Sequence, residues 1–307
     1  MNSSTVYDVR DYNNAVAAVL TLANSSIGLL LNITIIYTFI AYKSQKTSFY
    51  VICLFRAVSN TYVLACAFLG VFLPIIVLGH SIYSPIVETI LIAIASNCNL
   101  FNTFQGIYFS INRFFAFFFP RKYYLFFKIK WTVLFHLAIY AVQIWDVTLE
   151  MIYRYENEKY LLFSSRDLAY SGFLKTLEEL YVFIGLFVGI PFIVDMLTLT
   201  KYYYLRKSLF QTVKNRNEIK RNMIQFLQTV LQYSLFSINV IFNMLLATWI
   251  DHRMWTFFCQ TFVWQCLHVF DGFLMFMFNE HLSFVKATLF GNIHPARDLA
   301  SHVAPIS

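Results

Sequence analysis

The stretch SINRFFAFFFP, Ser110 to Pro120, marks the end of a long segment without formal charge. That segment runs from Thr89 to Asn112, so it exceeds the roughly 20 apolar residues that a helix needs to cross a bilayer. Arg113 is the first charged residue after it, and phenylalanines fill most of the positions before the proline. A soluble protein would rarely expose such a surface. The stretch therefore predicts one end of a membrane-spanning helix.

The composition of the whole chain agrees with this interpretation. Hydrophobic residues make up 59% of the 307 residues and charged residues only 13%, whereas soluble domains contain about 25% charged residues. Too few polar side chains are present to cover soluble domains of this total size. The formal net charge of +7 then belongs to loops beside a bilayer. It favours anionic lipid or an acidic protein as partner rather than nucleic acid.

Several segments of the chain are long and apolar enough to cross a membrane. They are 15–42, 47–83, 89–112, 131–149, 180–200, 223–250 and 254–279. Their apolar positions do not alternate, which favours helices over the strands of a membrane barrel. The sequence therefore predicts an all-α membrane protein, with a bundle of seven transmembrane helices in 15–280. An extracellular segment, 1–14, precedes the bundle, and a cytoplasmic tail, 281–307, follows it.

The positions of lysine and arginine orient this bundle. Most of them fall in the segments on one side of the predicted bundle, and 201–221 is especially rich in them. The segments on the other side contain fewer, among them Arg10, Arg154 and Arg253. Lysine and arginine accumulate on the cytoplasmic side of membrane proteins. We therefore expect a multi-pass plasma-membrane protein with its N-terminus outside and its C-terminus in the cytoplasm.

Polar side chains recur at helical spacing within four of the predicted spans. In the third span they include Asn102, Gln105 and Asn112. The other three spans carry Asn24 and Asn32; Gln225, Gln228, Gln232, Asn239 and Asn243; and Thr261, Gln265, His268 and Asp271. Amides lack partners in lipid, so these stripes should face one another. They could serve only as hydrogen bonds between helices, at about 0.6–2 kcal/mol each, or form a polar interior suited to a ligand or a switch.

Ionisable residues inside the spans are costly and need partners. His268 and Asp271 lie one helical turn apart, and we expect them to form a polar network inside the membrane. Its expected members are Asn32, Asn60, Gln228, Gln232, His268 and Asp271. By contrast, we expect Arg56 to extend to the cytoplasmic surface and Asp195 to pair with Lys201. His136 should form a hydrogen bond at a helix interface.

The opening stretch resembles the Asp-Arg-Tyr signature of rhodopsin-like receptors, in which a proline follows the acid by eight positions. Asn112 stands in the place of the acid, Arg113 in that of the arginine and Phe114 in that of the tyrosine, while Pro120 keeps the spacing. The resemblance implies that Arg113 lies between helices at rest and becomes available to a G protein when the sixth helix moves outward. The implied coupling residues are Asn112, Arg113, Phe114 and Pro120, with Lys220 and Arg221 at the inner end of the sixth span.

Nearly the whole chain resembles the nematode serpentine chemoreceptors of class X, the Srx family. The shared motifs are GLLLN (28–32), AVSN (57–60), SINRFFAFFFPRKYYLFF (110–127), FLQTVLQ (226–232) and TFVWQCLHVFDG (261–272). This resemblance implies a chemosensory G-protein-coupled receptor of sensory neurons, with a heterotrimeric G protein and a small ligand as partners. It implies neither a cofactor nor an enzymatic activity. The family usually has glutamine where Arg56 stands.

The ligand site expected from these resemblances lies in the outer half of the bundle. Ala95 occupies the position at which amine receptors place a carboxylate, which argues against an amine ligand. The candidate ligand-binding residues are Ala95, Asn99, Asn239, Asn243, Thr261 and Gln265. They suit a small, mostly apolar molecule with one or two hydrogen-bonding groups. Glu88 stands where a receptor disulfide would begin, so the outer loop is either held by packing or mobile.

Two other functions are compatible with a helical membrane protein. A transporter would show similar halves or interrupted spans in corresponding positions, and no counterpart of TFVWQCLHVFDG occurs in the first three spans. A membrane enzyme would need grouped catalytic side chains, whereas His136 and His268 lie far apart in different spans. The receptor interpretation is favoured, with a small-molecule transporter as the alternative.

Overall fold

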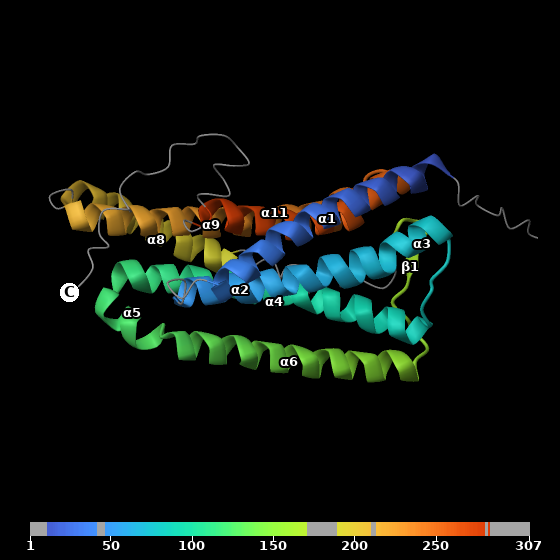
Figure 1. The fold of residues 1–307 in the computed structure, drawn as a ribbon, viewed down its shortest axis with the longest axis horizontal. Helices are drawn as coiled ribbons and strands as arrows, with labels where there is room; N and C mark the ends of the chain where they lie inside the picture. The colour runs from blue at the N-terminus through green and yellow to red at the C-terminus, as the bar shows by residue number, and fades with distance from the viewer. Residues whose placement is uncertain (1–10, 42–46, 171–188, 210–212, 280–281, 283–307) are drawn as a thin grey trace, which may run out of the picture.

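The computed structural model describes residues 11–41, 47–170, 189–209, 213–279 and 282. Long helices run side by side along the molecule (Figure 1). The helical elements are α1 (Tyr12–Ala41), α2 (Ser48–Tyr62), η2 (Val63–Phe72), α3 (Leu73–Leu78), α4 (Pro85–Phe118), α5 (Pro120–Phe126), α6 (Ile129–Glu156), α8 (Ile190–Leu209), α9 (Val213–Met244), η4 (Leu246–Thr248), α10 (Arg253–Thr256), η5 (Phe257–Phe262) and α11 (Val263–Phe278). Two short strands, β1 (Phe163–Ser164) and β2 (Ala169–Tyr170), form an antiparallel hairpin.

Six helical spans in the described part of the chain are long and apolar enough to cross a membrane. They are Tyr12–Ala41, Ser48–Leu78, Pro85–Phe118, Ile129–Glu156, Met223–Thr248 and Arg253–Phe278. The remaining predicted span, 180–200, has its second half in α8, and its first half lies outside the described residues. Of the predicted N-terminal segment 1–14, the structure describes 11–14, and of the tail 281–307 it describes only 282.

Helix α4 is longer than the charge-free segment that predicted it. It begins at Pro85, where the Ser84 side chain caps the first turn by accepting from the backbone N–H of Val87. It continues past Arg113 to Phe118, because nothing in the sequence stops it before Pro120. A proline disfavours helical geometry at the preceding residue, and Phe119 accordingly leaves the helix with φ −133° and ψ 60°.

The bundle places polar groups inside and many large apolar groups outside. Asn60, Gln105 and Asp271 are buried, whereas Val142 and Ile144 of α6 are each 67% exposed. This distribution suits a bundle whose surroundings are lipid rather than water. The spans predicted from charge-free segments are therefore arranged with their polar stripes inward.

Helices α1 and α11 approach each other closely at two glycines. A Cβ atom on Gly28 would lie 2.7 Å from a Val269 methyl carbon, and one on Gly272 would lie 2.5 Å from the Asn32 side-chain nitrogen. Both contacts are shorter than any side chain tolerates. Small residues allow this kind of packing between membrane helices, and here they bring the polar stripes of α1 and α11 together.

The two ends of the bundle differ, as Figure 1 shows. One end carries the β1–β2 hairpin beside α3 and is called the hairpin end. The opposite end carries α5 and is called the α5 end. In the orientation predicted from the sequence, the hairpin end is extracellular and the α5 end is cytoplasmic.

Candidate functional site in the helix bundle

A hydrogen-bonded network centred on Asp271 occupies the middle of the bundle. The Asp271 carboxylate of α11 accepts from Arg56 Nε of α2 at 2.8 and 2.7 Å. It also accepts from Asn60 Nδ2 at 2.7 Å and from Gln232 Nε2 of α9 at 2.9 Å. A single carboxylate therefore holds α2, α9 and α11 together.

Arg56 does not reach the cytoplasmic surface, and that expectation was wrong. It is buried, with 4% of its surface exposed, and forms an ion pair with Asp271. Its Nη1 also donates to the backbone oxygen of Asn102 at 3.2 Å. A guanidinium in the membrane interior needs a partner, and the Asp271 carboxylate across the α2–α11 interface provides it.

The network extends from Asp271 to α1 and α4 through Asn60. The Oδ1 atom of Asn60 accepts from Asn102 Nδ2 at 2.8 Å and lies 2.7 Å from His268 Nδ1. Asn60 Nδ2 also lies 3.3 Å from Asn32 Oδ1. The structure thus joins five of the six residues expected in the network. It adds Arg56 and Asn102, which that prediction had omitted.

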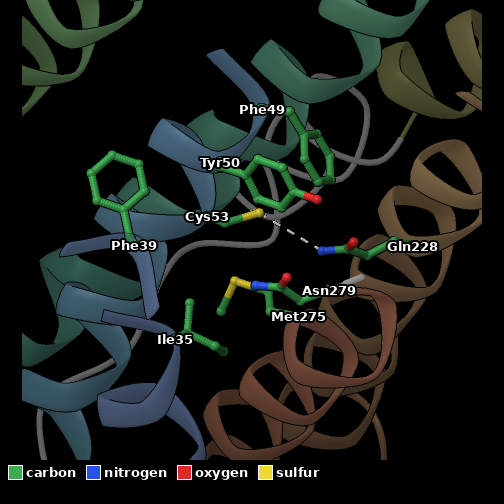
Figure 2. A pocket seen from close by; sticks show the side chains of 8 residues that line it. All are labelled: Ile35, Phe39, Phe49, Tyr50, Cys53, Gln228, Met275 and Asn279. Atoms are coloured by element: carbon green, nitrogen blue, oxygen red, sulfur yellow. Dashed lines mark hydrogen bonds between the residues drawn. The ribbon is translucent and has the colours of Figure 1, made fainter. Parts of the chain in front are cut away.

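Gln228, the sixth expected member, lies beside the network rather than in it. Its side-chain nitrogen is 3.8 Å from Cys53 Sγ, the contact drawn in Figure 2. The two side chains border a cavity of about 10 Å³, which is also lined by Ile35, Phe39, Phe49, Tyr50, Met275 and Asn279. This volume is at the lower limit for a single water molecule, so the cavity is not a ligand site.

Arg113 links three helices at the α5 end. It is buried near the end of α4, and its Nη1 donates to Gln225 Oε1 of α9 at 2.6 Å. Its guanidinium carbon lies 4.4 Å from the ring centre of Phe49 on α2, within the range of a cation–π contact. The position between helices that the rhodopsin-like resemblance implies is the position that the structure shows.

The neighbours of Arg113 in the signature differ in their surroundings. Asn112 is fully buried, and its amide has no hydrogen-bond partner among the described residues. Phe114 stacks on Phe118 with ring centres 4.4 Å apart. Pro120 is the first residue of α5. Lys220 and Arg221 fall within α9, and their side chains lie outside the described part of the structure.

The loop after α6 is hydrogen-bonded to α4 at the hairpin end. Glu88 is buried, and its carboxylate accepts from the backbone N–H of Phe163 at 2.7 Å. The Thr89 hydroxyl accepts from the backbone N–H of Leu161 at 3.0 Å. Of the two expectations for this loop, the structure shows the one in which it is held. Glu88 supplies a hydrogen bond at the position where a disulfide would begin.

Aromatic side chains of the hairpin pack against the η2 segment and α11. Phe163 stacks on Phe72 with ring centres 4.4 Å apart, and Tyr170 lies 5.4 Å from Trp264. Burial raises the pKa of the Tyr170 hydroxyl, so it stays protonated at physiological pH. The hairpin is therefore part of the core at this end.

Arg253 at the start of α10 connects the hairpin to the beginning of the chain. Its Nη1 donates to Asp11 Oδ2 at 2.5 Å, and its Nη2 donates to the backbone oxygen of Ser165 at 2.6 Å. A further contact joins Nη2 to Asn14 Oδ1 of α1. One guanidinium thus ties together three segments that are distant in sequence.

The six candidate ligand-binding residues lie on the helices expected for them but share no described cavity. Ala95, Asn239, Thr261 and Gln265 are buried, while Asn99 and Asn243 are half-buried. Gln265 Nε2 donates to the Thr21 backbone oxygen at 2.7 Å and to Ser25 Oγ at 2.5 Å, so it faces α1. The Thr261 hydroxyl donates to the backbone oxygen of Leu168 in the hairpin at 2.7 Å.

A cavity of about 370 Å³ lies where α4 and α6 reach the hairpin end, and it contains none of the six. It is lined by Ile86, Thr89, Ile90, Met151, Ile152, Arg154, Tyr155, Glu156 and Tyr160. Within the described residues, no three His, Cys, Asp or Glu side chains are grouped as a metal site requires.

Asp195 and His136 are two further ionisable residues for which the sequence predicted contacts. Asp195 is buried and forms no ion pair among the described residues, so the expected pair with Lys201 was wrong. Residues six positions apart do not share a helix face, and the Lys201 ammonium lies over the Phe118 ring instead. His136 lies at the interface with α2, where its ring stacks on Phe55. Its hydrogen bond, however, joins Nδ1 to the Thr132 backbone oxygen of its own helix at 2.7 Å rather than crossing the interface as expected.

The comparison with protein families identifies the chain. The model of the family described as "Serpentine type 7TM GPCR chemoreceptor Srx" matches residues 22–279. The chain belongs to the Srx family. No individually curated protein matches it.

Membership establishes the coarse function of this Srx protein. It is a multi-pass membrane receptor with the seven-helix architecture of G-protein-coupled receptors, and its class is one of receptors rather than enzymes. The matched range contains both the network around Asp271 and the Arg113 contact. Sequence reasoning missed the role of Arg56, although a signal existed. Arg56 precedes Asn60 by four residues, which places both on one face of α2.

Proposed function

We propose that this Srx receptor detects a small, mostly apolar molecule at its hairpin end and activates a heterotrimeric G protein at its α5 end. The observation that carries the coupling part is the hydrogen bond from Arg113 to Gln225, which joins α4 to α9 at the α5 end. The proposal places the N-terminus outside the plasma membrane, as the distribution of lysine and arginine predicts, and places the receptor in sensory neurons, as the family resemblance implies.

The contacts of Arg113 suit a switch because they come from different helices. Gln225 belongs to α9 and Phe49 to α2. If α9 moves outward, the hydrogen bond to Gln225 breaks while the contact with Phe49 can persist. The guanidinium then becomes available to a cytoplasmic partner. An element with two alternative sets of contacts is what a conformational switch requires.

The surface around this end has the charge that such a partner needs. Arg121, Lys122, Lys128 and Lys130 lie in or beside α5, and all four are exposed. Exposed basic residues next to a membrane attract anionic lipid and acidic protein surfaces. The α5 end is therefore proposed as the face that meets the G protein.

The ligand is proposed to bind near Ala95, Asn99, Asn239, Asn243, Thr261 and Gln265. These residues offer amides and hydroxyls amid aromatic side chains and no carboxylate, so the ligand carries hydrogen-bonding groups rather than an ammonium. Substitution of Asn99 or Gln265 by alanine should weaken the response to an active compound. Responses unaffected by both changes would remove this part of the proposal.

The test of coupling uses the full receptor in a reporter cell with a panel of volatile and water-soluble odorants. Arg113→Ala should abolish ligand-dependent nucleotide exchange on the G protein without lowering surface expression. Arg154→Ala is the control, because it removes an arginine from the last turn of α6, away from the proposed G-protein face, and should retain a response. Full signalling by Arg113→Ala would refute the proposed switch, and substrate uptake without guanine-nucleotide sensitivity would favour a transporter.

A further inference from the structure

Leu168 of the hairpin has an unusual backbone conformation. Its φ is 54°, in the left-handed region that bulky residues rarely adopt. Its side chain is nevertheless completely buried. A leucine held in this conformation needs surroundings that fix both its side chain and its peptide group.

The surroundings of Leu168 come from the helices that carry the candidate ligand-binding residues. Its side chain belongs to a single buried cluster with Ala95 of α4, Phe236 of α9 and Trp264 of α11. Its backbone oxygen accepts a hydrogen bond from the Thr261 hydroxyl at 2.7 Å. Thr261, which was singled out from the sequence as ligand-binding, therefore contacts Leu168 directly, and Ala95 belongs to the same buried cluster.

The chain on both sides of Leu168 is attached to the bundle by polar contacts. Before it, Glu88 accepts from the Phe163 N–H and Arg253 donates to the Ser165 oxygen. After it, Tyr170 packs on Trp264. These attachments are hydrogen bonds and ring contacts, and none of them is a covalent bond between the hairpin and the helices.

We infer that the place held by Leu168 is the ligand-binding site, and that the ligand is a small, uncharged carbonyl compound with a branched aliphatic group, which displaces Leu168. This inference rests on the proposed function and specifies its ligand. Leu168 itself defines the chemistry: an isobutyl group fills the apolar part, and a carbonyl oxygen meets the hydroxyl of Thr261. A ligand can bind only the fraction of receptor molecules in which Leu168 has left the site. The apparent Kd therefore equals the intrinsic Kd divided by that fraction.

The probe is 4-methyl-2-pentanone, which combines an isobutyl group with a carbonyl. A ligand that binds the folded state raises the thermal unfolding midpoint, so the midpoint of the purified full-length receptor is measured in nanodiscs against ketone concentration. Leu168→Gly removes the resident side chain, and glycine adopts a φ of 54° without strain. We expect this variant to respond at a concentration about tenfold or more below that needed by the wild type.

Two controls separate this site from an ordinary apolar cavity. In Leu168→Gly combined with Thr261→Val, the hydroxyl donor is lost, and the response to the ketone should disappear. The alkane 2-methylpentane, which lacks the carbonyl, should shift the midpoint of Leu168→Gly much less than the ketone does. Leu161→Ala vacates another buried leucine of the same loop and should respond no better than the wild type.

The inference fails if wild type and Leu168→Gly respond at the same ketone concentration. It also fails if the alkane matches the ketone, or if Thr261→Val leaves the response unchanged. Leu168→Ala replaces the glycine variant if the latter does not fold, with the same expected outcomes. The assay contains no G protein, so ketone binding without nucleotide exchange in the reporter cell would refute the coupling proposal and leave the site intact.

Discussion

At the scale of single residues, the central feature is a buried ion pair between Arg56 and Asp271. Burying two charges costs desolvation free energy that their attraction offsets only with good geometry and further hydrogen bonds. Both conditions hold here, because Asn60 and Gln232 also donate to the carboxylate. Replacing one partner of the pair should therefore lower the free energy of unfolding much more than replacing both partners together.

Substitution of Asp271 by asparagine should destabilise the receptor by about 3–5 kcal/mol, because it leaves the Arg56 guanidinium buried without a counter-charge. Adding Arg56→Gln, which removes the unpaired charge and keeps an amide that can form hydrogen bonds, should recover most of that loss. Thermal unfolding of both single variants and the double variant measures the coupling. The matched control is Glu150→Gln in the more exposed pair with Arg154, which should cost no more than about 1 kcal/mol. Additive losses at Asp271 and Arg56 would show that the pair is not coupled.

A second prediction at this scale concerns the residue before Arg113. Asn112 is buried at the same end of α4, and Asn112→Asp would place a carboxylate next to the guanidinium. The attraction should hold Arg113 in its resting position and lower basal nucleotide exchange on the G protein. Asn112→Ala, which adds no charge, controls for loss of the amide. Unchanged or raised basal activity in the aspartate variant would count against a resting lock.

At the scale of elements, contact between α1 and α11 depends on a missing side chain. Gly272→Ala should destabilise the bundle by about 1–3 kcal/mol, because the new methyl group would overlap the Asn32 amide and push the helices apart. Gly189→Ala is the matched control, since among the described residues, apart from its chain neighbours, no heavy atom lies within 4 Å of the added Cβ. Comparison of thermal unfolding midpoints decides the point. Equal midpoints for the two variants would mean that α1 and α11 accommodate the added methyl group without loss of stability.

At the scale of the whole molecule, the orientation of the bundle remains a prediction from the distribution of lysine and arginine. Epitope tags at the two termini should be accessible from opposite sides of the plasma membrane, with the N-terminal tag outside. Labelling of intact and permeabilised cells measures this. Both tags in the same compartment would contradict a seven-span topology and with it the proposed roles of the hairpin end and the α5 end.

The sequence predicts those features of this molecule that the bilayer determines, and it does not predict those that depend on contacts between distant helices. Bilayer thickness fixes the length of a span, so helices such as α4 could be located from charge-free segments alone. The inward direction of the polar stripes followed from the cost of amides in lipid. The partner of Arg56 could not be predicted, because pairing across helices depends on the rotation of α2 against α11. Leu168 was missed because its conformation depends on contacts with distant helices, and nothing in its local sequence indicates them.

The attachment of the hairpin also bears on how the receptor can be prepared. All five cysteines are unpaired thiols within or beside the helices, and the loop is fastened to Glu88 and Thr89 without sulfur chemistry. Dithiothreitol should therefore leave this face folded, unlike a face held by a cystine bridge. The folding of this face therefore needs no oxidative machinery in the host that produces the receptor.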